Sequence, residues 1–180
     1  MKGFILGVLV TIAVIVVVGL FVAETGRLNM RADNPPSSIE TRLAGHAMDE
    51  SVARSAPQLT NPRQPTDANL IHGATIYFDH CALCHGDPVH PRSPLADTLN
   101  PPPPQFVEDE PDMPEYQNYY ITVHGVRWTG MPGWKNVLKD DEIWDVVTFL
   151  SHMGKLPPAA KSVFALQGQA AATAPEKASK

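Results

Sequence analysis

Two cysteines and a histidine stand together near the middle of the chain, at Cys81, Cys84 and His85. The spacing Cys-x-x-Cys-His lets two thiols bond to the vinyl groups of one haem while the adjoining imidazole faces its iron. The chain has only these two cysteines. A redox dithiol or half of a zinc site is disfavoured, because no βαβ pattern surrounds the pair and no further thiol completes a zinc site. The sequence therefore predicts one covalently bound haem c.

Two methionines, each followed by proline, compete for the sixth position of such an iron: Met131 and Met113. Met131 has three glycines around it, namely Gly125, Gly130 and Gly133. These allow unusual backbone angles, so a fixed loop can present the thioether. Met113 has acidic neighbours and no glycine nearby. We expect Met131 to be the axial ligand, with Met113 or a histidine as the alternatives.

Three motifs occur in the order typical of one family: Gly73-x-x-x-Tyr77 before Cys81-x-x-Cys84-His85-Gly86, then Thr129-Gly130-Met131-Pro132, then Asp141-Glu142-Ile143-Trp144. From about residue 69 to 156 the chain resembles class I (mitochondrial-type) monohaem cytochromes c, including bacterial membrane-anchored members. The resemblance implies a small all-α domain around one covalent haem c. It also implies a role for each motif residue: thioether attachment at Cys81 and Cys84, the proximal ligand His85 and the distal ligand Met131. Lys139 departs from the family, which often has a capping Ser or Thr there, so Asp140 is expected to cap the last helix instead.

The amino-terminal region contains 20 residues without a charge, from Phe4 to Ala23. A helix of that length spans about 30 Å, the thickness of the bilayer hydrocarbon. The alternative is a secretory signal, which has a shorter apolar region and a small-x-small cleavage site, whereas bulky Phe21 occupies the outer recognition position here. We expect an uncleaved single-pass anchor. Because c-type cytochromes receive their haem after export, the resemblance implies a bacterial inner membrane with the haem domain on the periplasmic side.

Four regions follow from composition and pattern: an anchor and juxtamembrane segment (1–30), a linker with one helix (31–66), a cytochrome c domain (67–156) and a disordered tail (157–180). A capping box at Ser37-Ser38-Ile39-Glu40 begins the linker helix, which Pro57 stops after about Ser55. This helix has few apolar residues on any one face, so we interpret it as a spacer or a subunit contact.

Two further helices are expected to cross in the cytochrome c domain. The first carries an apolar face at helical spacing: Leu70, Ala74, Tyr77 and Cys81. Gly73 on this helix predicts a close approach to the second, which runs from Asp140 to Met153. A short helix is also expected from Gln117 to His124.

Prolines separate the cysteine motif from Met131, including the run Pro101 to Pro104. They favour an extended, stiff path, which we interpret as a scaffold around the haem edge rather than a recognition ligand. Tyr119, Tyr120 and Trp128 are candidates to hydrogen-bond haem propionates, with ordinary packing as the equal alternative.

The net charge is −5, and residues 69–156 contain twelve acidic and five basic side chains. Such a field disfavours nucleic acid and favours a redox partner with basic residues. With both axial positions filled, the expected function is one-electron transfer by a membrane-anchored carrier, not an enzyme. The alternatives are a cytochrome c subunit of a larger membrane oxidoreductase complex and a gas-binding haem sensor or enzyme.

Overall fold

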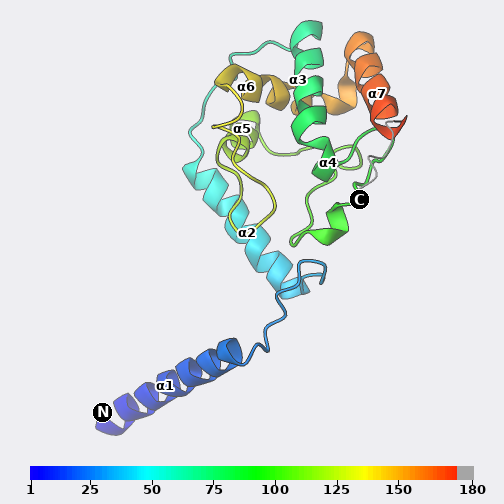
Figure 1. The fold of residues 1–180 in the computed structure, drawn as a ribbon. Coiled ribbons are helices and arrows are strands. Elements are labelled where there is room, and N and C mark those ends of the chain that lie inside the picture. Colours follow the sequence, from blue (N-terminus) through cyan, green and yellow to red (C-terminus); the bar gives the residue numbers. More distant parts are fainter. Residues whose placement is uncertain (174–180) are drawn as a thin grey trace. The chain divides into compact units, whose positions relative to one another are not determined.

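The computed structural model describes residues 1–173 and contains no strand among them. The chain forms two compact units, residues 1–34 and a second unit that begins at Pro35 (Figure 1). Its helices are α1 (Lys2–Glu24), α2 (Ser38–Ser55), α3 (Asp67–His80), α4 (Ala82–His85), α5 (Glu115–His124), α6 (Asp140–Ser151) and α7 (Pro158–Thr173). Two 3₁₀ turns, η1 (Ala96–Thr98) and η2 (Met153–Lys155), complete the second unit. The all-α fold predicted from the sequence is confirmed.

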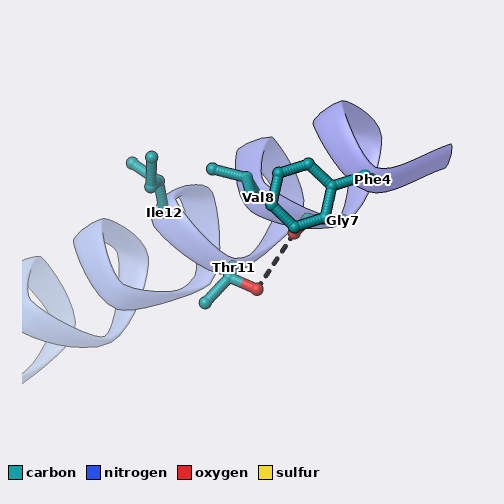
Figure 2. Close-up of a pocket in the computed structure, with 5 residues that line it drawn as sticks. All are labelled: Phe4, Gly7, Val8, Thr11 and Ile12. Atoms are coloured by element: carbon teal, nitrogen blue, oxygen red, sulfur yellow. Dashed lines mark hydrogen bonds between the residues drawn. The ribbon is translucent and has the colours of Figure 1, made fainter. Parts of the chain in front are cut away.

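Helix α1 is the one described helix that is long and apolar enough to cross a membrane. None of its residues is buried. Figure 2 shows one stretch of its surface, where the Thr11 hydroxyl donates a hydrogen bond of 3.0 Å to the Gly7 carbonyl. This bond satisfies the hydroxyl within the helix, as an apolar surrounding requires.

Helix α2 begins with the predicted capping box. The Glu40 N–H donates to the Ser37 hydroxyl at 3.2 Å, and the Ser37 N–H donates to the Glu40 carboxylate at 3.3 Å. Val52 is buried in the second unit, whereas Ile39 and Leu43 are exposed. The helix therefore meets the rest of its unit near its carboxyl end, where it contacts α5.

The core lies where α3 meets α6 and α7, which Figure 1 shows side by side with it. A Cβ atom at Gly73 would lie 2.2 Å from the Asp145 carbonyl oxygen and 2.8 Å from Phe149 Cβ. The two backbones thus approach each other as closely as the glycine predicted. Phe149 is fully buried at this crossing and packs on the ring of Tyr77 at 5.5 Å.

Replacing Gly73 with alanine is expected to destabilise the protein by about 1–3 kcal/mol, because the added methyl overpacks a contact made by backbone atoms. The matched control is Gly45→Ala on α2, where a Cβ would meet nothing within 4 Å. That control should gain up to about 1 kcal/mol from helix propensity. Denaturant unfolding followed by circular dichroism measures both. Equal stabilities for the two variants would contradict the close crossing.

Residues 158–173 form a packed helix, so the prediction of a disordered tail is wrong for them. In α7, Ala160 is fully buried and Phe164 is 7 % exposed. The Phe164 ring meets those of Phe78 and Phe149 at 5.3 and 5.1 Å. The Ala-rich composition of this segment suggested disorder, but its one aromatic residue, Phe164, packs into the core. The helical core therefore extends beyond residue 156. Residues 174–180 of the predicted tail lie outside the described residues.

Helix α6 starts one residue away from the expected cap. Lys139 occupies the N-cap position, and its N–H donates to the Glu142 carboxylate at 2.7 Å. Asp140 is the first helical residue and accepts a hydrogen bond from the Tyr119 hydroxyl instead. The expectation that Asp140 is the cap is therefore wrong, because Glu142 satisfies the free N–H from the third helical position.

Candidate haem site

The cysteine motif follows α3 directly and forms the short helix α4. Cys81 ends α3, and its carbonyl accepts hydrogen bonds from the N–H groups of Cys84 at 3.0 Å and His85 at 2.9 Å. Both cysteines are half-buried, whereas His85 is only 8 % exposed. One helical turn thus brings together the two thiols and the imidazole that the sequence singled out.

His85 is held as a neutral imidazole with one ring nitrogen free. Its Nδ1 lies 2.8 Å from the Pro104 carbonyl oxygen, which can only accept, so Nδ1 carries the proton. Burial lowers the pKa of His85, and the hydrogen bond to Pro104 opposes that shift in part. The Nε2 lone pair is then available to a metal, the usual arrangement for a metal-bound histidine. Attachment of a haem c requires two thiols that bond to its vinyl groups and an imidazole that binds its iron, so the residues present fit it.

The segment 104–106 braces the motif from the side. The Gln105 side-chain amide donates to the Cys84 carbonyl at 3.0 Å, and the Phe106 N–H donates to the His85 carbonyl at 3.1 Å. The Phe106 ring also lies parallel to the imidazole, with centroids 4.5 Å apart and an interplanar angle of 5°. Sequence reasoning treated Pro104 only as part of a stiff scaffold and missed Gln105 and Phe106.

Tyr77 and Gly86 fix the far end of the motif. The buried Tyr77 hydroxyl lies 2.7 Å from the Gly86 carbonyl and 3.2 Å from the His85 carbonyl. Burial raises the pKa of Tyr77 far above its ordinary value, so the phenol stays a donor. Gly86 has φ +84°, and a Cβ there would lie 2.3 Å from the Pro91 carbonyl oxygen. Only glycine fits this turn.

The Cys81 thiol lies in surroundings that disfavour its reactive thiolate form. Burial raises the pKa of Cys81 to about 12, with a further contribution from Cys84 beside it. A thiolate is the nucleophilic form of cysteine, so the folded chain keeps Cys81 protonated at neutral pH.

The loop that carries Met131 is closed by its own backbone. The Val126 N–H donates to the Met131 carbonyl at 3.1 Å, and the Met131 N–H donates to the Thr129 hydroxyl at 3.0 Å. Gly125 turns the chain with φ +70°, and a Cβ at Gly130 would lie 3.2 Å from the Leu99 side chain. The loop is therefore fixed, as the glycine pattern predicts, and it packs against the segment between the motif and Pro104.

The competing residues have other surroundings. Met113 precedes α5, and its carbonyl accepts a hydrogen bond from the Asn118 amide at 2.9 Å. Tyr119 and Trp128 are candidates to hydrogen-bond haem propionates. The Tyr119 ring stacks on Trp144 with centroids 4.0 Å apart, which favours ordinary packing over a bond to a propionate for this tyrosine. Desolvation, with a smaller contribution from the hydrogen bond to Asp140, raises the pKa of the Tyr119 phenol to about 12. Trp128 is 89 % exposed.

A buried carboxylate ties the preceding linker to the helices of the site. Asp145 on α6 has a side chain only 1 % exposed and accepts two hydrogen bonds from Arg63, at 2.6 and 3.0 Å. His72 Nδ1 on α3 lies 2.8 Å from the same carboxylate. The Asn61 amide donates to the Thr148 hydroxyl at 2.8 Å. Residues of the predicted linker thus belong to the packed domain.

Comparison with known proteins agrees with this site. Residues 68–150 match the family model described as "Cytochrome C oxidase, cbb3-type, subunit III". No curated protein matches the chain. The matched range runs from α3 to α6 and contains both the cysteine motif and the Met131 loop. It indicates the c-type cytochromes as a group, and the narrower mitochondrial-type class stays a prediction. Residues 68–150 are therefore similar to a c-type cytochrome domain, a haem-binding module of electron transport.

Proposed function

We propose that this chain is a membrane-tethered one-electron carrier with one haem c attached through Cys81 and Cys84. The observation that carries the proposal is the state of His85, a buried neutral imidazole whose Nδ1 is engaged by the Pro104 carbonyl. Bound haem supplies an iron that changes its charge by one electron. The chain's own residues bind that iron, exclude water from it and tune its potential.

In this proposal His85 Nε2 and the Met131 sulfur would hold the iron of the haem. With both residues bound, no position would remain for a substrate, so the haem would supply one-electron transfer and the chain would need no general base or nucleophile. A methionine–histidine pair also gives the iron a higher reduction potential than ligation by two nitrogens would. Gln105, Phe106 and Tyr77 hold the motif so that His85 keeps one orientation.

The proposed location is the periplasmic face of a bacterial inner membrane, with α1 as the single-pass anchor. Helix α1 has the length and composition to span a bilayer. The orientation follows from the attachment of haem to c-type cytochromes after export. The acidic domain, with twelve acidic and five basic side chains in residues 69–156, favours a redox partner that presents lysine or arginine.

Haem is expected to stay on the wild-type polypeptide after boiling in detergent, because thioether bonds survive denaturation. Cys81→Ser and Cys84→Ser should each strongly reduce the amount of haem-stained protein. Leu83→Ala, at a side chain 69 % exposed between the two cysteines, is the control and should keep its haem. The measurement is haem staining after gel electrophoresis. Complete extraction of haem from the wild type by acidic acetone would contradict covalent attachment.

A second candidate is a subunit role in a membrane oxidase complex. The family description over residues 68–150 favours it, since it names subunit III of a cbb3-type oxidase. The exposed residues Ile39 and Leu43 on α2 are available for such an assembly. The native mass after gentle detergent extraction separates the two: a carrier runs as the single chain, whereas a subunit co-purifies with larger partners.

A further inference from the structure

The ring of Phe106 is a partner of the proposed iron ligand that the metal-binding motif itself does not contain. It lies parallel to the His85 imidazole, with an interplanar angle of 5° and centroids 4.5 Å apart. Parallel aromatic stacks of this kind are favourable beyond the area that they bury. The imidazole is thus held at its edge by the Pro104 carbonyl and on one face by Phe106.

The two contacts restrain different motions of the imidazole. A single hydrogen bond at Nδ1 fixes one edge of the ring but still lets the ring tilt about that bond. A parallel aromatic ring opposes the tilt, because tilting drives the imidazole edge into the face of its neighbour. Phe106 resists displacement, since its N–H bonds to the His85 carbonyl at 3.1 Å and its side chain packs against the hydrophobic core.

We propose that Phe106 is a positioning residue that sets the plane of the His85 imidazole about its bond to the iron. The proposal rests on the proposed function, in which His85 Nε2 binds the haem iron. In a low-spin ferric haem, the direction of the imidazole plane, together with the orientation of the other axial ligand, sets which iron d orbital holds the unpaired electron. That direction sets how spin density is spread over the haem edge, where electrons enter and leave. Outer-shell partners that fix the orientation of a ligand act in this way on metal centres.

The test compares Phe106→Leu with Phe106→Tyr in the full-length haem protein. Leucine keeps an apolar side chain but removes the stack, whereas tyrosine keeps the aromatic ring. Phe78→Leu is the matched control, because Phe78 packs on the same core and meets Phe164 at 5.3 Å. The readouts are the g-values of the ferric protein by electron paramagnetic resonance and the proton shifts of the four haem methyl groups. Phe106→Leu should change the g-values and the order or spread of the methyl shifts. Phe106→Tyr and Phe78→Leu should keep the wild-type pattern.

Two results would overturn the proposal: a wild-type pattern in Phe106→Leu, or the same change in Phe106→Leu and Phe78→Leu. The latter would show general loosening of the core. A measurement on the wild type tests the same contact without relying on the folding of a variant. In the diamagnetic ferrous protein, nuclear Overhauser contacts should join the His85 and Phe106 ring protons, and their absence would also overturn the proposal. Failure of the proposed function looks different, since a wild type without covalent low-spin haem would give none of these spectra.

Discussion

On the proposed assignment of Met131 as an iron ligand, we expect Met131→Ala to lower the reduction potential of the haem and to open its iron to carbon monoxide. Loss of a thioether ligand removes the preference for the ferrous state that sulfur confers. We expect a fall on the order of 0.1–0.3 V, part of the ~0.8 V range that axial ligands set. The variant should also lose the weak red absorption band that a methionine sulfur gives with ferric iron. Redox titration and the reduced spectrum with and without carbon monoxide measure these changes.

Met113→Ala is the matched control for that experiment. Met113 is also followed by proline, but it lies before α5, outside the closed loop of residues 125–134. This variant should keep the potential, the red band and the resistance to carbon monoxide. Loss of the band in Met113→Ala alone would move the ligand assignment to that residue. Rapid binding of carbon monoxide by the wild type would replace electron transfer with the gas-binding alternative.

Asp145→Ala is expected to destabilise the helical domain by about 2–3 kcal/mol. Asp145 is 1 % exposed and joins three parts of the chain through Arg63 and His72. Removing one partner of a fully buried ion pair typically costs about 3–5 kcal/mol. The expected loss is smaller here, because the Arg63 side chain that remains is 33 % exposed and stays partly solvated. Unfolding by urea, followed by circular dichroism, measures the loss.

Asp79→Ala is the control, since Asp79 on α3 is an exposed carboxylate near the same core. Its effect should stay within about 0.5 kcal/mol, as for most surface positions. If Asp145→Ala and Asp79→Ala unfold at the same urea concentration, the buried cluster does not stabilise the fold.

The helices that the sequence predicted well are those whose signals are local. The apolar spacing along α3 and α6, the capping box before α2 and the glycine at the crossing each depend on neighbours within a few residues. Cys81, Cys84 and His85 are likewise adjacent in the chain, so their spacing alone predicted a haem. The assignment of Met131 to the iron stays a prediction, although its loop is closed as the glycines indicated.

The contacts that the sequence did not predict join residues far apart. His85 meets Pro104 and Phe106 across an irregular, proline-rich segment that has no periodicity from which to read a register. Arg63 and Asp145 form one of many possible charge pairs, and only the folding of the segment before α3 against α6 brings them together. Helix α7 was missed because its single aromatic anchor, Phe164, stands in an Ala-rich stretch that composition alone assigns to disorder.

The packing of α7 on α3 also imposes an order on biogenesis. The main partners of α3, which leads into the cysteines, are α6 and α7, and both come later in the chain. In the proposed periplasmic orientation, Cys81 and Cys84 would leave the export channel before residues 140–173, which contain the helices that cover α3. The thioether bonds proposed for these cysteines would form most readily at that stage, while the thiols are accessible. Once α6 and α7 pack on α3, the thiols become less accessible. The proposed haem attachment would therefore precede the packing of these two helices.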